Sequence, residues 1–319
     1  MGSYKEKLLR VIRGDANLRL SLILRFPKLF SDEKYIRLKY KLRTGKDINL
    51  ENPTTFNEKL NWLKLNYHNP MMTVMADKYW VKQWVAEKIG AEYVVPCYGK
   101  WADVESIPFD QLPDKCFLKS NQDSGVGIVF DRKAGVKLKA ILKRFSKGRV
   151  SGKNYYWFSR EWGYKNIEPC ILAEQFLDEG TGHELQDYKF WCFNGVPQYM
   201  YITNKGSAVK ENFYDMDFNP VDINHGYPRV VPEFKKPENF EKMKQFAAVL
   251  SKGMPFVRID FFDVKGSLYF GECTFYDWGG MKAFSDDKWD LKLGGLISLP
   301  SCSCHKKCFC STIIKTLTL

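Results

Sequence analysis

The 319-residue chain is predicted to be an α+β protein whose sheets are antiparallel. Two observations favour this class: helical and strand-like segments alternate along the chain, and most strand-like segments are joined to their neighbours by short turns. The hydrophobic fraction of 45% is sufficient for the substantial core of a globular protein. A doubly wound parallel sheet is disfavoured, because its strands are joined by helices instead of hairpins.

The first 50 residues are strongly basic. They hold 13 Lys or Arg against 5 Asp or Glu, which is +8 of the chain's net charge of +12. Residues 4–46 have a helical pattern, and solvated helix faces are the simpler explanation of the charge, since no block of five like charges occurs. The alternative is a peripheral contact with an anionic lipid or polymer surface. A further helix begins within residues 52–66, where Thr55 and Glu58 complete a capping box.

The middle of the chain is expected to contain both helices and strands. The helices are predicted over residues 77–90, 137–145 and 238–253, the first of them ending at Gly90. The strands are predicted over residues 92–99, 115–120, 170–177 and the end of 121–130.

Two hairpins are predicted in the second half of the chain. One spans residues 187–203 and turns at Asn194-Gly195. The other, "RIDFFDVKGSLYFGECTFYDWGG" (258–280), places Asp260 opposite Glu272 in either of two registers. One has a three-residue loop Lys265-Gly266-Ser267, and the other has a two-residue turn Lys265-Gly266 with a bulge near Gly271. In both registers the two carboxylates converge.

Converging carboxylates require a cation or a shared proton between them. Oxygen ligands beside a phosphate are the usual environment of Mg²⁺, and Arg258 lies on the same strand face as Asp260, where it could meet an anion. An ordinary charged, solvent-facing sheet surface explains the hairpin alone equally well. Two upstream lysines favour the metal and phosphate interpretation: Lys78 stands at a helix start, and Lys119 precedes the glycine-containing turn "NQDSGVG".

Taken in order, the segments "NPTTFNEKLNWLKL", "DKYWVKQWVAEKIG", "LPDKCFLKSN", "DYKFWCFNG" and "RIDFFDVKGSLYFGECTF" resemble the TupA-like ATP-grasp proteins, named for teichuronopeptide biosynthesis. The likeness covers roughly residues 48–300 and implies an ATP-grasp fold, in which two α+β lobes close on ATP, with a helical N-terminal extension. The expected domains are a basic helical region (1–70), a lobe with the lysines and a flexible loop (71–172), a lobe with the hinge and hairpin (173–300), and a Cys-rich tail (301–319) expected to be disordered.

The resemblance implies roles for individual residues. The two phosphate-binding lysines and the loop that closes over the triphosphate correspond to Lys78, Lys119, Ser124, Gly125 and Gly127. The hinge that reads the adenine edge corresponds to Glu174, Gln175 and Leu177. Asp178 or Glu179 would lie near the ribose, and Lys189 would point toward the same cleft. Asp260 and Glu272 match the two magnesium carboxylates, with Arg258 as the catalytic arginine.

The sequence departs from the family pattern at several points. Thr274 stands where an Asn often serves as a third metal ligand, and "NQDSG" replaces the usual N-H-G-S-G loop. A Pro-Gly-rich turn is expected after the second acid, but the chain has "YDWGG". The usual Rossmann-like N-terminal lobe is also missing, because residues 1–70 have a helical pattern.

The function implied by the resemblance is an ATP-grasp ligase that joins a carboxylate to an amine through an acyl phosphate. Its cofactors would be ATP and Mg²⁺, and its partners a small amine and a carboxylate-bearing saccharide or polymer precursor of a surface polysaccharide, teichuronopeptide-like or capsular. One alternative is a glycosyltransferase that uses the D-x-D triplet Asp215-Met216-Asp217, although this triplet is also common in loops. Another is a non-catalytic polysaccharide-binding pseudoenzyme. Nucleic-acid binding is disfavoured, because the basic residues are not concentrated on a recognition element.

The sequence features that bear on location favour the cytoplasm, at the inner face of the membrane if the basic region binds lipid. The most apolar stretch, residues 18–30, is interrupted by Arg19, Arg25 and Pro27, and no signal-peptide core opens the chain. Five cysteines lie singly in apolar runs and are expected to be reduced core thiols: Cys97, Cys116, Cys170, Cys192 and Cys273. The cluster "CSCHKKCFC" (302–310) has zinc-type ligands in an unusually tight spacing, and is expected not to bind metal.

Overall fold

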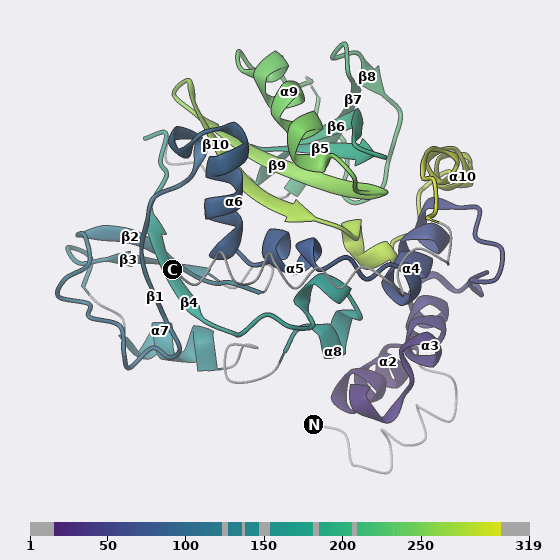
Figure 1. The fold of residues 1–319 in the computed structure, drawn as a ribbon, viewed down its shortest axis with the longest axis horizontal. Coiled ribbons are helices and arrows are strands. Elements are labelled where there is room, and N and C mark those ends of the chain that lie inside the picture. Colours follow the sequence, from purple (N-terminus) through teal and green to yellow (C-terminus); the bar gives the residue numbers. More distant parts are fainter. Residues whose placement is uncertain are drawn as a thin grey trace.

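The computed structural model describes residues 16–122, 127–135, 138–146, 154–180, 185–205, 209–231 and 233–300. Its strands form two antiparallel sheets, which confirms the predicted α+β class (Figure 1). The smaller sheet has the order β1-β4-β2-β3 and contains β1 (Cys97–Trp101), β2 (Lys115–Ser120), β3 (Gly127–Asp131) and β4 (Ile171–Gln175).

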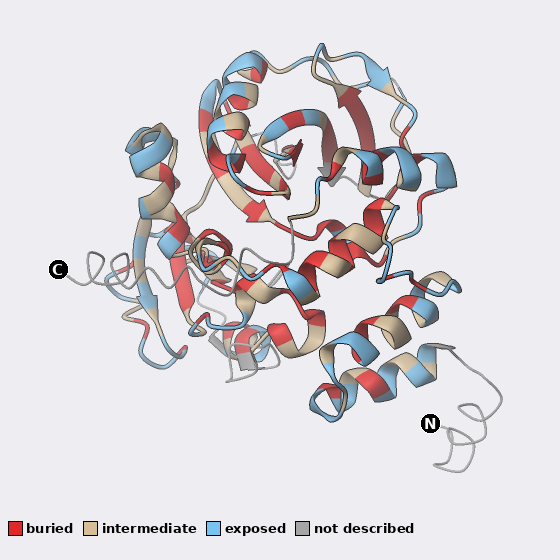
Figure 2. Cartoon of the chain, turned by 45° about the vertical axis from the view of Figure 1, so that its right-hand side comes forward, coloured by how far each residue is buried: buried red, intermediate tan, exposed pale blue. Residues whose placement is uncertain are grey.

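The larger, six-stranded sheet has the order β10-β9-β5-β6-β7-β8. Its strands are β5 (Asp187–Phe193), β6 (Val196–Lys205), β7 (Val209–Asp215), β8 (Pro220–Val221), β9 (Phe256–Val264) and β10 (Ser267–Thr274). Figure 2 shows that the central strands of this sheet are largely buried.

Helices surround both sheets. The N-terminal group is α2 (Ala16–Arg25), the 3₁₀ turn η1 (Pro27–Leu29), α3 (Asp32–Thr44) and α4 (Phe56–Asn66). The others are α5 (Met71–Ala76), α6 (Trp80–Ile89), α7 (Leu138–Ser146), α8 (Tyr156–Ser159), α9 (Phe240–Ser251) and α10 (Asp287–Leu296), with 3₁₀ turns η2 (Ala91–Tyr93), η3 (Trp162–Tyr164) and η4 (Asp277–Gly280). Among the described residues, no helix combines the length and the apolar character that crossing a bilayer requires.

The predicted capping box at the start of α4 is confirmed. Thr55 accepts a hydrogen bond from the backbone amide of Glu58 at 3.3 Å, and the Glu58 carboxylate accepts one from the Thr55 amide at 3.0 Å. Such a cap contributes about 1 kcal/mol to the free energy of unfolding. It sets the start of α4, whose buried Phe56 stacks on Trp191 in the main core.

Both predicted hairpins turn where the sequence indicates. Asn194 and Gly195 have φ values of 50° and 82°, and Lys265 and Gly266 have 53° and 81°, as two-residue type I′ turns require. In the second hairpin Ser267 pairs with Val264, so the two-residue turn is confirmed and the three-residue loop is wrong.

The register of the second hairpin shifts by one residue at Gly271. The pairing is irregular between Phe270 and Glu272, and beyond this bulge Glu272 pairs with Asp260. A Cβ atom at Gly271 would lie 3.1 Å from the carbonyl oxygen of Asp260, so the bulge is packed closely against the facing strand. The predicted convergence of the two acids therefore depends on this bulge.

Each sheet has its own hydrophobic core. The larger core packs the six-stranded sheet against α4, α5, α6, α9 and α10, and the smaller packs the four-stranded sheet against α7. On β9, Val257, Ile259 and Phe261 enter the larger core, which directs Arg258 and Asp260 to the opposite face of the strand. Asp260 is only 2% exposed, so the interpretation of a solvent-facing charged sheet is wrong for this residue.

Two predicted boundaries differ from the structure. The strand expected over 92–99 begins only at Cys97, because residues 91–93 form η2 and Pro96 has no amide hydrogen to donate to a ladder. The helix expected from residue 77 begins at Trp80, because the Asp77 carboxylate accepts hydrogen bonds from the amides of Tyr79 and Trp80. The predicted end at Gly90 is confirmed.

Candidate functional site

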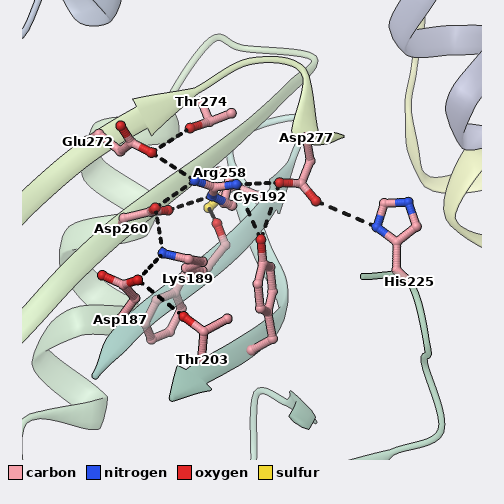
Figure 3. A network of polar contacts seen from close by, with 12 residues as sticks. Asp187, Lys189, Cys192, Thr203, His225, Arg258, Asp260, Glu272, Thr274 and Asp277 are labelled. Atoms are coloured by element: carbon pink, nitrogen blue, oxygen red, sulfur yellow. Dashed lines mark hydrogen bonds and ion pairs between the residues drawn. The ribbon is translucent and has the colours of Figure 1, made fainter. Parts of the chain in front are cut away.

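Arg258 of β9 joins the two predicted metal carboxylates. Its Nε and Nη2 donate to the two carboxylate oxygens of Asp260, each at 2.7 Å, and Nη2 also donates to Glu272 Oε1 at 2.9 Å (Figure 3). Asp260 and Glu272 thus point to the same side of the hairpin, as their pairing predicts. In this arrangement the guanidinium provides the positive charge that two adjacent carboxylates require.

A third carboxylate lies on the far side of the guanidinium. Asp277 belongs to η4, directly after the hairpin, and accepts a hydrogen bond from Arg258 Nη1. It also accepts one from the hydroxyl of Tyr201 at 3.2 Å, and its second oxygen lies 3.7 Å from His225 Nδ1. Trp278 and Gly279, with φ values of 47° and 64°, bend the chain sharply here. The strained turn directs Asp277 back toward β9.

Lys189 lies on the neighbouring strand β5, directly opposite Asp260 in the sheet. Its Nζ is 3.1 Å from Asp260 Oδ2 and 3.1 Å from Asp187 Oδ2. Asp187 also accepts a hydrogen bond from Thr203 Oγ1 at 3.2 Å. Asp260 is therefore held by two cations, while only 3% of its side chain is exposed.

Lys78 connects this site with the four-stranded sheet. Its Nζ lies 3.7 Å from Glu272 Oε2, and its backbone amide donates to the carbonyl of Asn121, just beyond β2, at 3.0 Å. Asn121 in turn donates to the Asp77 carboxylate at 3.0 Å. The segment that leads into α6 therefore places an ammonium group at the second acid of the hairpin.

A second charged cluster lies beside the four-stranded sheet. Glu174 of β4 lies 2.6 Å from the ammonium of Lys119 and 2.8 Å from that of Lys82, measured from its two oxygens. Only 5% of the Glu174 side chain is exposed. Lys82, which no sequence motif indicated, also donates to the carbonyl of Val95 at 2.7 Å. The cluster carries one more positive than negative charge, which suits an anionic ligand.

The pKa shifts follow from burial and from these partners. Burial raises the pKa of Asp260 above its ordinary value, although Arg258 opposes the rise. Burial acts on Glu272 in the same sense, but Lys78 and Arg258 outweigh it and lower the pKa of that carboxyl. For Asp277 the attraction of Arg258 also outweighs burial, and the pKa is lowered to about 2. Of these three acids, Asp260 is consequently the one whose ionised form is disfavoured by its surroundings.

The donor set fits a magnesium ion bound together with phosphate. The described residues contain no group of three or more His, Cys, Asp or Glu side chains that could hold a metal by themselves. Mg²⁺ is commonly held by one or two carboxylates, with substrate phosphates and water completing its shell. Asp260 and Glu272 supply two such carboxylates, and 30% of the Glu272 side chain remains accessible. The oxygen of Thr274 lies 3.4 Å from Glu272 Oε1, so a hydroxyl stands at the position of the expected third ligand.

The remaining predicted residues have different surroundings. Gly127 begins β3, where a Cβ atom would lie 2.4 Å from the Phe117 ring, so a larger residue would displace that ring. Gln175 ends β4, and Leu177 and Asp178 follow it. Asp178 pairs with Lys115 at 3.5 Å on the surface. Ser124, Gly125 and residues 302–310 lie outside the described part of the chain.

Asp215 of the D-x-D triplet Asp215-Met216-Asp217 has a local structural role. Asp215 accepts hydrogen bonds from the amides of Asp217 and Asn219 at 2.9 and 2.8 Å, and from the Asn219 side chain at 3.0 Å. These bonds close the turn after β7. The cysteine prediction is confirmed in part. All five cysteines of the described residues are free thiols, but only Cys116, Cys192 and Cys273 are buried, whereas Cys97 and Cys170 are half-buried.

Several polar residues of the site were not predicted, namely Lys82, Asp187, Tyr201, His225 and Asp277. Asp187 could have been found, because it stands two positions before Lys189 on one strand and therefore shares its face. Asp277 belongs to the noted departure "YDWGG". The others come from separate elements, and no local pattern indicates that they meet.

Comparisons with known proteins give one family match. The family described as TupA-like ATPgrasp matches residues 58–298. No curated protein sequence matches the chain.

Several solved structures are similar to the chain at low identity. D-alanine–D-alanine ligase from Bacillus anthracis is 13% identical with a TM-score of 0.39, covering 64% of this chain and 58% of its own. The ligase PsnB, complexed with a phosphomimetic precursor variant, Mg and ADP, is 12% identical with a TM-score of 0.39, covering 77% and 62%. D-cycloserine synthetase DcsG is 12% identical with a TM-score of 0.38, covering 65% and 64%. The chain thus spans less than two thirds of each.

Proposed function

The chain belongs to the TupA-like ATP-grasp family, and from this premise we propose that it is an ATP-dependent ligase that joins a carboxylate to an amine. Its two antiparallel sheets with flanking helices are the ATP-grasp fold. The observation that carries the proposal is the pairing of Asp260 with Glu272 around one guanidinium, with Lys78 and Lys189 beside them.

The side chains suit phosphoryl transfer, which needs mainly positioning and charge neutralisation. Lys78 and Lys119 would hold the phosphates of ATP, and Glu174 orients Lys119 through their ion pair. Asp260 and Glu272 would hold Mg²⁺, which when bound neutralises phosphate charge and aligns the triphosphate. Arg258 lies between these acids, so its guanidinium would stand beside the reacting groups when the two carboxylates hold the cation.

The reaction would proceed in two balanced steps. A carboxylate oxygen of the substrate attacks the γ-phosphorus, the bond from that phosphorus to the bridging oxygen breaks, and ADP leaves. The amine nitrogen then attacks the acyl carbon, and phosphate leaves with its electron pair while the nitrogen loses a proton. Arg258 would stabilise the negative charge that develops on the acyl oxygen in the second step. No nucleophilic Ser or Cys is required.

The substrate classes follow from the family alone. We propose a carboxylate-bearing saccharide or polymer precursor and a small amine, in the biosynthesis of a surface polysaccharide of the teichuronopeptide or capsular kind. Use of ATP favours a reaction in the cytoplasm.

The first test is a thermal-shift measurement with nucleotides, with and without Mg²⁺. A ligand that binds only the folded state raises the melting temperature, so ATP with Mg²⁺ is expected to raise it more than ATP alone. Stabilisation by a UDP-sugar without any effect of ATP would favour a glycosyltransferase. No magnesium-dependent nucleotide effect would indicate a binding protein without ligase chemistry.

The second test uses variants of the hairpin acids. Asp260→Ala and Glu272→Ala are expected to abolish ATP consumption while circular dichroism remains unchanged. Asp263→Ala is the matched control, because Asp263 lies on β9 at a position of the opposite face and contacts Asn239. Full ATP consumption by both site variants would refute the metal assignment.

A further inference from the structure

An exposed apolar surface lies at the N-terminal edge of the described chain. Its residues are Leu22, Phe26 and Leu29, with exposed fractions of 42%, 49% and 78%. The Phe26 amide donates to the Leu22 carbonyl at 3.3 Å, and the Leu29 amide donates to the Phe26 carbonyl at 3.2 Å. The first of these bonds places Phe26 beside Leu22, one turn later at the end of α2. The backbone departs from helical geometry at Phe26, where φ and ψ are −128° and 54°, and Leu29 follows in η1. The three exposed apolar side chains therefore lie on one short segment, at the end of α2 and in η1.

Basic side chains border this apolar surface. Arg19, Arg25 and Lys28 are exposed between and beside its members. The Arg25 guanidinium lies 5.7 Å from the centre of the Phe26 ring, and the Lys28 ammonium lies 5.0 Å from that of Trp157. Basic and apolar side chains are therefore interleaved on one short segment.

The surrounding residues add to the positive charge. Residues 16–46 contain nine Lys or Arg and two Asp or Glu, a net charge of +7. Both acids are engaged within the protein: Asp32 pairs with Arg160 at 2.8 Å, and Glu33 pairs with Arg37 at 2.8 Å. The segment as a whole is therefore suited to a partner with high negative charge.

The segment is anchored to the rest of the protein. Arg160, which is 1% exposed, donates to the carbonyl of Pro27 at 2.6 Å and to that of Phe30 at 3.3 Å. The Tyr35 hydroxyl donates to the carbonyl of Phe158 at 2.9 Å. These bonds join η1 and α3 to α8 and its flank, so the segment is a packed element. Figures 1 and 2 show that α2 and α3 lie at the edge of the molecule.

We infer that the surface formed by Leu22, Phe26 and Leu29 with Arg19, Arg25 and Lys28 docks on an anionic lipid bilayer. Apolar side chains of such a segment enter the boundary between headgroups and acyl chains, while basic ones remain among anionic headgroups. A nucleic acid or an anionic polysaccharide would pair with the basic residues but leave the apolar ones in water. A second copy of this chain would bring two strongly positive segments together. An anionic bilayer is the partner that would contact both the apolar and the basic side chains.

Co-sedimentation with vesicles tests this docking independently of any ligase activity. The full chain is expected to bind phosphatidylcholine vesicles that contain phosphatidylglycerol, not pure phosphatidylcholine vesicles, and binding should weaken as ionic strength rises. The variant Arg25→Glu/Lys28→Glu should bind at least about twentyfold more weakly, since each basic residue contributes about fivefold. The variant Leu22→Ser/Phe26→Ser/Leu29→Ser, which keeps every charge, should bind at least about tenfold more weakly.

The matched control is Lys235→Glu/Lys252→Glu. It changes the net charge equally at exposed positions near the two ends of α9, which lies far from α2 in both views (Figures 1 and 2). Its affinity for vesicles should remain within about twofold of that of the unsubstituted chain, because salt screens the attraction between distant basic residues and the anionic headgroups. Circular dichroism shows whether each variant is folded. If the triple variant unfolds, Leu29→Ser alone, at the most exposed position, replaces it.

Three outcomes would overturn the inference. The first is equal loss of binding in the control, which would indicate attraction by net charge alone. The second is binding that depends on the basic residues but not on the apolar ones, which would indicate an anionic polymer as the partner. The third is self-association that the triple variant abolishes in light scattering, with no vesicle binding, which would make the surface an interface between copies.

Discussion

Arg258 donates a hydrogen bond to Asp277, a buried carboxylate that lies outside the hairpin carrying Asp260 and Glu272. The bond gives the guanidinium a partner that does not belong to the proposed metal pair. If Mg²⁺ binds Asp260 and Glu272, Arg258 therefore keeps one ion pair and its orientation. Asp277 lies in "YDWGG", the segment where a Pro-Gly-rich turn was expected.

Asp277 should make the protein sensitive to acid. Its pKa is lowered from 3.8 to about 2, because Arg258 and His225 outweigh the effect of burial. Because folding lowers this pKa, the ionised carboxylate stabilises the folded state when the pH is above the ordinary pKa of an aspartate. This contribution, about 2 kcal/mol, is lost as the pH falls from about 4 toward 2. Urea unfolding should show that Asp277→Asn is less stable near neutral pH and that the difference shrinks over this range. A difference that does not vary with pH would contradict the assignment.

Lys119 and Lys82 should have separable roles although both pair with Glu174. Each substitution to Met should lower the free energy of unfolding by about 1–3 kcal/mol, because Glu174 loses one partner of two. Only Lys119→Met should weaken ATP binding, by about tenfold or more, since Lys82 is also bound to the Val95 carbonyl. Isothermal titration measures the affinity. An equal loss of ATP affinity in the two variants would show that both lysines bind phosphate.

The bulge at Gly271 should matter to ligand binding more than the turn at Gly266. An alanine Cβ at position 271 would lie 3.1 Å from the Asp260 carbonyl oxygen, whereas one at position 266 meets nothing within 4 Å but has an unfavourable φ of 81°. Both Gly→Ala changes should cost about 1 kcal/mol or more. Only Gly271→Ala should reduce the magnesium-dependent thermal shift, because it displaces Glu272 from Asp260. Similar thermal shifts for the two variants would show that the bulge does not align the acids.

Lys64 should produce a rise in stability at alkaline pH. This α4 lysine is 3% exposed, and burial lowers its pKa from 10.5 to about 8, although Glu161 opposes the shift. Between these values the unfolded chain binds more protons than the folded one, so the free energy of unfolding rises with pH, by up to about 3 kcal/mol. Lys64→Met should lack this rise. The measurement is the difference in unfolding free energy between the unsubstituted chain and Lys64→Met at several pH values. A difference that does not change with pH would exclude a lowered pKa of the Lys64 ammonium.

Local patterns predicted the hairpins, the start of α4 and the pairing of Asp260 with Glu272. Asn-Gly and Lys-Gly turns with positive φ, a capping box and strand alternation are encoded within a few residues of the structures they specify. The two possible turns left the register of the second hairpin open. The structure has the register with a two-residue turn and a bulge, and in it Gly271 packs against the Asp260 carbonyl. The effect of Pro96 on the start of the first strand could not be predicted locally. A missing amide hydrogen shortens a strand only where the partner strand has a carbonyl facing that position.

Sequence alone was enough for the α+β class, the family resemblance and the two hairpin acids, because these follow from short-range periodicity and from the order of motifs. The positions of Lys82, Asp187, Tyr201, His225 and Asp277 around the site were decided only by the tertiary structure. These residues come from α6, β5, β6, η4 and the loop after β8, and long-range packing brings them together. Burial and neighbouring charges then shift the pKa values of Lys82, Tyr201 and Asp277, and burial is a property of the folded chain that no single segment carries.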